Sequence, residues 1–245
     1  MKKVNKLYYL GPAFRRERPQ KGRQRQFHQF GVEAIGSENP EQDAEIIAMS
    51  FNIFNMLGVE NLNLVINSVG SKETKEKYSR LLKKYLAKYV NNLSETSKER
   101  FEKNPLRILD TKIKDEIEII KEAPSILECL DENEKTHFDK VQRYLNKLNI
   151  PFQVDSNLVR GLDYYTLTTF EVRTSSLGSQ DALCGGGRYN NLVENLGGNP
   201  MPAFGFAAGM ERLMMALNLD SKENEIKTSV FIIACLLYTS PSPRD

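Results

Sequence analysis

Arginines occur in four separate polar clusters of this 245-residue chain, and their arrangement indicates anion chemistry. The run FRRERPQKGRQRQFHQFG, from Phe14 to Gly31, holds five arginines beside Glu17. The other clusters are LVRGLDYYT with Arg160, CGGGRYNNL with Arg188, and GFAAGMERL with Arg212. A planar guanidinium group binds phosphate or carboxylate oxygens through two donors. Several separate arginines on one sheet therefore suit a multiply charged anion, although each cluster alone is a weak signal.

Composition limits the other kinds of chemistry. The formal net charge of +2 and a pI near 8.3 allow an anionic partner without requiring one. The cysteines are odd in number and far apart, which favours a reducing compartment over a disulfide framework. With two histidines, His28 and His137, and no paired cysteine motif, a zinc site has little support. No apolar run reaches the ~20 residues that span a membrane.

The first cluster lies on a predicted β-hairpin, in which KLYYLGPAFRRERP and RQFHQFGVEAI are the two strands. In the second strand, Phe30, Val32 and Ala34 share one face, which is typical of core packing. The other face carries a mixed set: Phe27, Gln29, Gly31 and Glu33. Such a face predicts the floor of a small-ligand site, with Gly31 leaving room for the ligand. The alternative is the water-facing side of an antiparallel sheet.

The remaining elements follow from periodicity and glycine. Asn39-Pro40 predicts a helix start and Gly58 its stop, and NLNLVIN predicts a strand. Residues 71–150 contain no glycine and show helical periods, which predicts a helical insertion that places His137 on a helix surface. Its lysine-rich face favours solvent, with RNA contact as the alternative. We then expect strands at PFQVD and YYTLTTFEVRT, a glycine-rich turn and short helix at CGGGRYNNLVENLGG, and a strand running into a helix at PAFGFAAGMERLMMAL.

The four clusters together resemble a known family. FRRERPQKGRQRQFHQFG looks like motif 2 of class II aminoacyl-tRNA synthetases, and GFAAGMER looks like motif 3. LVRGLDYYT and CGGGRYNNL are similar to two segments specific to histidyl-tRNA synthetases. The resemblance runs to about Leu219 and implies an α+β fold. In such a fold, a class II synthetase-type antiparallel sheet of about six strands is flanked by helices and interrupted by a helical insertion domain.

The resemblance also implies the ligands, which are ATP, Mg²⁺, L-histidine and tRNA(His), in a cytoplasmic homodimer. The implied ATP site comprises Arg15 at the α-phosphate, Glu17 and Phe27 at the adenine, Arg212 at the γ-phosphate and Glu211, which would help to position metal or phosphate. Arg23 at the turn belongs to the same ATP site, with the tRNA acceptor end as its alternative partner. Arg160 would bridge the histidine carboxylate and the α-phosphate, so that Arg15, Arg160 and Arg212 would be catalytic. The implied histidine pocket comprises Gln29, Gly31, Glu33, Arg160, Tyr164, Tyr165, Arg188 and Tyr189.

The same resemblance divides the chain. Residues 1–70 and 151–220 would form the catalytic domain, 71–150 the insertion, and 221–236 a linker with the first strand of an anticodon-binding domain. We expect motif 1 to precede the N-terminus of this chain. The last residues, 237–245, have no counterpart in the family and are interpreted as non-native, with a native disordered tail as the alternative.

Two other functions compete with a ligase. A synthetase-like regulatory subunit of ATP phosphoribosyltransferase would be expected to lose the ATP arginines and the insertion. Here Arg15, Glu17, Arg160, Arg212 and the insertion are all present, which favours the enzyme. A general RNA-binding protein would explain the basic residues but not the two unlike faces of the second strand.

Overall fold

A seven-stranded sheet forms the centre of the computed structural model, which describes residues 4–16, 24–160, 164–178 and 181–217. The strand order is β1-β2-β7-β6-β5-β3-β4, and every neighbouring pair is antiparallel except the parallel pair β3–β4. The strands are β1 (Asn5–Phe14), β2 (Gln26–Ile35), β3 (Leu62–Ser68), β4 (Gln153–Val154), β5 (Thr166–Thr174), β6 (Ala182–Arg188) and β7 (Ala203–Gly209). The predicted antiparallel sheet is therefore confirmed, and the α+β class with it.

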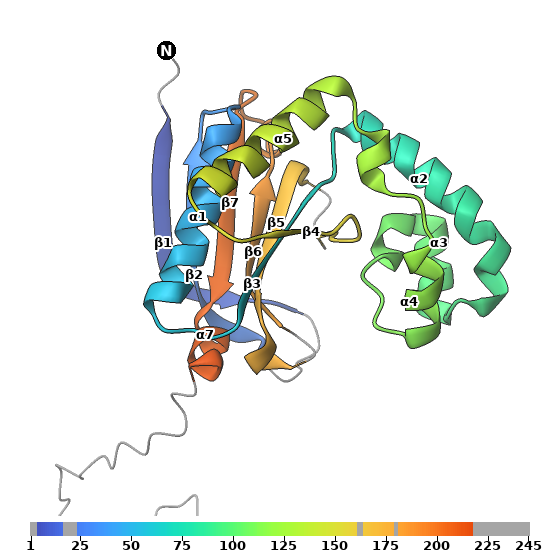
Figure 1. Cartoon of the computed structure of the whole chain (residues 1–245), viewed down its shortest axis with the longest axis horizontal. Coiled ribbons are helices and arrows are strands. Elements are labelled where there is room, and N and C mark those ends of the chain that lie inside the picture. The colour runs from blue at the N-terminus through green and yellow to red at the C-terminus, as the bar shows by residue number, and fades with distance from the viewer. Residues whose placement is uncertain (1–3, 17–23, 161–163, 179–180, 218–245) are drawn as a thin grey trace, which may run out of the picture.

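Two helices, α1 and α5, cross one face of the sheet, and three others lie beside it (Figure 1). The helices are α1 (Pro40–Met56), α2 (Lys72–Leu86), α3 (Glu95–Lys103), α4 (Lys114–Lys121), α5 (Glu132–Lys147), α6 (Leu192–Asn195) and α7 (Met210–Ala216). Short 3₁₀ turns are η1 (Ala87–Asn92), η2 (Pro105–Ile108), η3 (Ile126–Cys129) and η4 (Ser175–Leu177). No helix within the described ranges has the length and apolar character to cross a bilayer.

The main core lies between the sheet and α1. The helix begins as predicted, because Asn39 is extended and Pro40 occupies the first helical position. It ends before Gly58, whose φ of +82° suits a residue without a Cβ atom. Ile46 and Phe54 of α1 are fully buried in this core, and Ala34 of β2 is buried there too. The predicted core face of β2 is thus confirmed.

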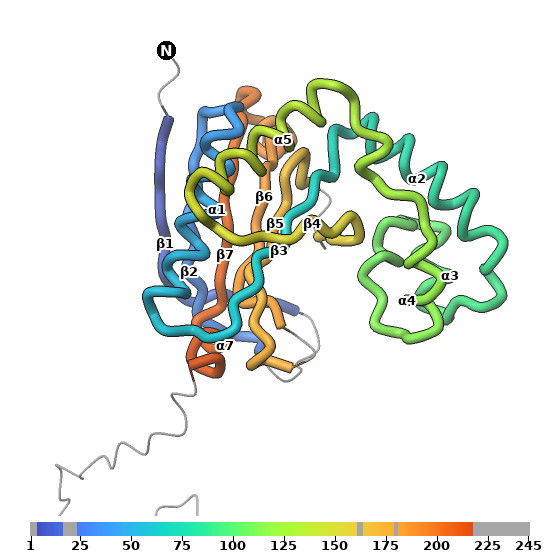
Figure 2. The backbone as a smooth tube through the Cα atoms, in the orientation of Figure 1, coloured from blue at the N-terminus to red at the C-terminus, as the bar shows by residue number. Residues whose placement is uncertain are grey.

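The chain between β3 and β4 divides between two cores. The stretch from α2 to η3 has its own hydrophobic cluster, which includes Tyr78, Leu82 and Ile126. Helix α5 instead packs on α1 and contributes Val141 and Leu145 to the main core. Figure 2 shows the chain leaving the sheet through α2 and returning through α5. We therefore propose that the insertion ends near residue 131 instead of 150.

A buried carboxylate joins the start of α2 to the start of α5. Glu134 accepts hydrogen bonds from the Ser71 N–H at 2.6 Å, the Thr74 hydroxyl at 2.7 Å and the Asp131 N–H at 2.9 Å. Burial raises its pKa, but these donors to the charged form outweigh that effect, and the net pKa is lowered. The exit and return points of the insertion are therefore held together by one side chain.

The segment CGGGR is a strand, and its prediction as a turn was wrong. It forms β6, between β5 and β7. A run of three glycines is typical of a turn, but here glycine is needed because the neighbours are too close. A Cβ atom on Gly186 would overlap the carbonyl oxygen of Gly205, with the Phe206 Cβ 2.7 Å away. The rest of the predicted segment, the short helix α6, is present.

Candidate functional site

A cleft of ≈ 680 Å³ lies on the sheet face opposite α1. Its floor consists of small residues on the two central strands, among them Gly185 on β6 and Gly205, Ala207 and Gly209 on β7. Side chains from β1, β2, β5, the segment before β5 and α7 form its walls. This volume is typical of a site for a small molecule or cofactor. The mixed face of β2 therefore faces a cleft and not a flat solvated surface.

One end of the cleft pairs an acid with a tyrosine. The Tyr189 hydroxyl donates a short hydrogen bond to Glu33 Oε2, and the Tyr164 ring meets the Tyr189 ring edge-on with centroids 5.9 Å apart. Burial raises the pKa of Glu33, although the bond from Tyr189 opposes this. Burial raises the pKa of Tyr189 too, and the neighbouring Glu33 raises it further. Tyr189 is therefore a protonated donor at neutral pH, beside an acceptor.

Three arginines, Arg15, Arg160 and Arg212, also line the cleft. The Arg15 guanidinium stacks over the Phe27 ring, 3.8 Å from its centroid, and Arg212 Nη1 donates to the Ala182 carbonyl at 2.6 Å. Arg160 donates through Nη1 to Glu171 in a short ion pair. Two buried atoms, Nε of Arg15 and Nε of Arg160, have no hydrogen-bond acceptor among the described residues. A buried donor without an acceptor is costly, so both atoms favour an anionic ligand in the cleft.

The start of α7 adds a carboxylate beside the arginines. Glu211 Oε1 accepts a hydrogen bond from the His28 backbone N–H at 2.8 Å, and His28 Nδ1 lies 3.1 Å away. Burial raises the pKa of Glu211, but hydrogen bonds from its own backbone and from His28 lower it below the usual value. Among the described residues, no cluster of three or more His, Cys, Asp or Glu side chains could hold a metal ion by itself.

The structure brings most of the predicted site residues to this one cleft. They are Arg15, Phe27, Gln29, Glu33, Arg160, Tyr164, Tyr165, Tyr189, Glu211 and Arg212. Glu17 and Arg23 fall outside the described residues. Arg188 and Gly31 lie elsewhere, each for a physical reason given next.

Arg188 does not line the cleft, contrary to the prediction. It lies opposite Phe204 in the ladder between β6 and β7, and so it points to the core face, where its side chain is fully buried. Side chains alternate along a strand, so Arg188 and Tyr189 point to opposite faces. The prediction went wrong because CGGGR was interpreted as a turn, which imposes no such alternation.

The space above Gly31 is taken by a side chain of the protein. A Cβ atom there would lie 2.5 Å from the Tyr9 ring and its hydroxyl. Tyr9 is on β1 opposite Gly31, and its hydroxyl accepts a hydrogen bond from Gln29 Nε2 at 2.6 Å. Gly31 therefore admits Tyr9, which lines the cleft in its place.

Two cleft residues, Tyr9 and Glu171, were missed. Tyr9 has the same parity as Arg15 along the first strand of the hairpin, and Glu171 alternates with the core residues Phe170 and Val172. The alternation that identified the floor on β2 could therefore have found both residues on β1 and β5.

A family model matches the part of the chain that contains all four arginine clusters. The model describes histidyl-tRNA synthetase and matches residues 1–213. The chain belongs to the histidyl-tRNA synthetase family. A histidine–tRNA ligase of Crocosphaera subtropica is 48% identical over 231 residues, which are 94% of this chain and 53% of the relative. One of Thermosynechococcus vestitus is 51% identical over 214 residues, or 87% of this chain and 50% of the relative. The chain thus spans about half the length of these histidyl-tRNA synthetase relatives.

Solved structures agree with this assignment. The apo histidyl-tRNA synthetase of S. aureus matches with a TM-score of 0.67 and 41% identity, over 91% of this chain and 53% of that one. A Bacillus halodurans protein described as an ATP phosphoribosyltransferase regulatory subunit/histidyl-tRNA synthetase matches at a TM-score of 0.60 and 26% identity, over 87% and 58% of the two chains. Of these two solved structures, the S. aureus histidyl-tRNA synthetase is the more similar to this chain, in both TM-score and sequence identity.

The partly buried carboxylate of Glu33 should cost stability. Folding raises the pKa of Glu33, so the folded state binds more protons, and stability falls as pH rises from 4.5 through the folded pKa. The penalty is complete at pH values above the raised, folded-state pKa. We therefore expect Glu33→Gln to be more stable than the parent chain at pH 7 in urea denaturation, with the difference shrinking below pH 4.5.

The matched control is Glu38→Gln, which removes an exposed carboxylate from the loop after the same strand. It should leave the urea midpoint unchanged at both pH values. A lower midpoint for Glu33→Gln at pH 7 would contradict the assigned cost of burial.

Proposed function

We propose that the protein carrying this chain is a histidine–tRNA ligase, which uses ATP to convert L-histidine into histidyl-adenylate and then transfers histidine to tRNA(His). One observation carries the proposal: a single cleft combines two arginines whose buried Nε donors lack an acceptor among the described residues with an acid–tyrosine pair. The arginines suit the phosphates of ATP. The pair suits an imidazole ring, because a neutral imidazole has one donor and one acceptor nitrogen.

Adenylate formation needs alignment more than acid–base catalysis. An oxygen of the histidine carboxylate attacks the α-phosphorus, and the bond from that phosphorus to the bridging oxygen of pyrophosphate breaks. The carboxylate is already a nucleophile, so no base is required. Both reactants are anions, and Arg15 and Arg160 would neutralise the charge that develops at phosphorus. Arg160 keeps its charge in the cleft: burial lowers its pKa, but Glu171 more than compensates and the net pKa is raised.

Mg²⁺ fits this site only with ATP as its main ligand. Among the carboxylates that line the cleft, Glu211 lies at the start of α7 next to Arg212, and its lowered pKa keeps it ionised. When bound, the cation would shield the β- and γ-phosphates. Glu211 would orient the hydrated ion, and Arg212 beside it would hold the γ-phosphate.

We also propose that the complete protein binds tRNA(His), forms a homodimer and acts in the cytoplasm. The homodimer is supported by β1, the edge strand of the sheet, which exposes Leu7, Tyr8, Leu10 and Phe14. Exposed apolar side chains on an edge strand favour coverage by another surface. Size-exclusion chromatography with light scattering of the complete gene product tests the dimer.

The direct test of the ligase is histidine-dependent ATP–pyrophosphate exchange by the complete gene product. We expect exchange with histidine and none with other amino acids, and charging of a tRNA(His) transcript. Binding of histidine without any exchange would contradict the ligase and favour a regulatory subunit. Calorimetry of the 245-residue chain, first with histidine and then with ATP, shows which of the two ligands this chain binds by itself.

A further inference from the structure

Arg188, which lies outside the cleft, is the largest fully buried side chain among the described residues. All five of its N–H donors have acceptors. Nε donates to Asp43 Oδ2 at 3.3 Å, and Nη2 to Asp43 Oδ1 and, at 3.2 Å, to the Asn39 carbonyl. Nη1 donates to the Ser37 carbonyl at 2.8 Å and to Asn190 Oδ1 at 3.2 Å. Hydrogen bonds are directional, so moving the guanidinium group would break one or more of these bonds.

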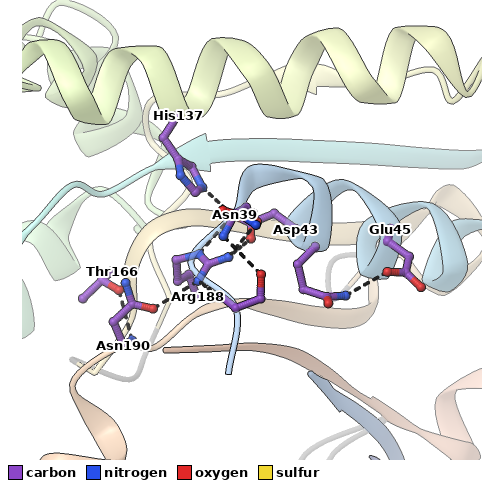
Figure 3. Close-up of polar contacts among 9 residues, drawn as sticks. Asn39, Asp43, Glu45, His137, Thr166, Arg188 and Asn190 are labelled. Atoms are coloured by element: carbon purple, nitrogen blue, oxygen red, sulfur yellow. Dashed lines mark hydrogen bonds and ion pairs between the residues drawn. The ribbon is translucent and has the colours of Figure 1, made fainter. Parts of the chain in front are cut away.

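A histidine from the other core helix completes the cluster. His137 on α5 lies with Nε2 2.7 Å from Asp43 Oδ2, and Figure 3 shows His137 and Arg188 converging on Asp43 from two sides. The His137 side chain is 12% exposed and that of Asp43 is 0% exposed, so the predicted surface position of His137 was wrong. Because Asp43 is ion-paired with Arg188 and accepts, Nε2 of His137 carries the proton.

The cluster joins the two chain segments that supply the acid–tyrosine pair of the cleft. Glu33 is on β2, and Ser37, Asn39 and Asp43 follow it within ten residues. Tyr189 directly follows Arg188, and its N–H donates to the Ala203 carbonyl at 2.9 Å. Through its side chain, Arg188 thus ties the chain just before Tyr189 to the backbone that follows Glu33.

The residue after Tyr189 is held by the same cluster. Asn190 accepts from Arg188 through its side chain and donates through its backbone N–H to Thr166 Oγ1 at 3.3 Å. Tyr189 is therefore fixed on both sides, while its hydroxyl meets Glu33 across the sheet.

Stability alone is a poor explanation for this arrangement. A buried ion pair often contributes no more to stability than apolar residues of the same volume, because desolvation offsets the attraction. What such a pair does supply is a fixed geometry, since each donor needs its acceptor. The geometry fixed here is the spacing between Glu33 and Tyr189.

We propose that Arg188, Asp43 and His137 form a positioning cluster that sets the Glu33–Tyr189 spacing and thereby the affinity of the cleft for the imidazole ring. The inference rests on the proposed function, since histidine is the ligand concerned. None of the three side chains lines the cleft. They act from the opposite face of the sheet, so the cluster should affect histidine more than ATP.

The test compares His137→Leu with His137→Gln in the complete gene product, measured by ATP–pyrophosphate exchange. Leucine removes the donor to Asp43, whereas glutamine keeps an N–H at a similar reach. We expect His137→Leu to raise the KM for histidine about tenfold, with kcat and the KM for ATP changed less than about twofold. His137→Gln should restore most of the histidine affinity. Arg188→Lys, which keeps the charge but loses the five-donor pattern, should raise the histidine KM further.

Other outcomes overturn the inference. An unchanged histidine KM in His137→Leu would show that the cluster does not affect the affinity of the cleft for histidine. Equal losses for histidine and ATP, with no rescue by glutamine, would show a merely structural role. Failure of the parent protein to exchange at all would instead overturn the proposed ligase function, so the two failures are distinguishable.

Discussion

Arg160→Ala in the complete gene product should reduce histidine-dependent ATP–pyrophosphate exchange by about 10²–10³-fold while the fold persists. The loss should be mainly in kcat, because Arg160 would neutralise charge that grows as the carboxylate attacks phosphorus. Its buried Nε atom has no acceptor among the described residues, so the donor is free for that task without breaking an existing bond.

The fold should survive this change because the partner of Arg160 keeps a second cation. Glu171 accepts from Arg173 Nε at 2.9 Å as well as from Arg160. Losing one of two charged donors to a partly buried carboxylate costs about 1–3 kcal/mol, which a domain of ordinary stability tolerates. Circular dichroism and the urea midpoint measure this cost independently of activity.

Arg173→Ala is the matched control. It removes the other arginine from the same carboxylate, but Arg173 does not line the cleft. Exchange should therefore fall far less than in Arg160→Ala. Equal losses of exchange in the two variants would show that the loss comes from disturbing Glu171, the carboxylate that both arginines contact. Exchange that survives Arg160→Ala would reject the proposed bridging role of Arg160.

The two faces of β2 could be predicted because alternation along a strand is local, whereas the α+β fold was implied by the family resemblance. Two unlike faces, one with Phe30 and one with Glu33, are enough to orient a strand between a core and a site. The same reasoning did not reach β6, because a glycine run has no side chains whose pattern reveals a strand. Arg188 was therefore assigned to the cleft when it points to the core.

Other residues could not be placed because their partners are distant in sequence. His137 meets Asp43 across 94 residues, and nothing in the pattern around either one indicates the pair. Alternation along β1 is enough to place Tyr9 on the cleft face, but its contact with Gly31 depends on hairpin register, which the hydrophobic pattern and the turn geometry set together. Local periodicity thus finds the faces of elements, whereas long-range polar pairs require coordinates.

Gly185→Ala should inactivate the cleft without unfolding the protein. A Cβ atom at Gly185 would overlap the guanidinium of Arg160, which is the far end of a flexible side chain and can move away. The strand itself accepts alanine, since the backbone at Gly185 is not in the left-handed region. Displacing a catalytic group by about 1 Å costs about 10²-fold in rate, so we expect a loss of that order in exchange activity.

Two other glycines, Gly186 next to it on β6 and Gly11 on the edge strand β1, make the comparison decisive. Gly186→Ala places its Cβ against the Gly205 carbonyl oxygen and the Phe206 Cβ, which cannot move aside, so it should lower stability by about 1–3 kcal/mol or more. Gly11→Ala meets no described atom within 4 Å and should change neither property. Alanine at two adjacent positions of β6 would then have different effects. At Gly185 it lowers exchange activity, and at Gly186 it lowers the free energy of unfolding. If Gly185→Ala instead retains full exchange, Arg160 does not act from the position that the cleft gives it.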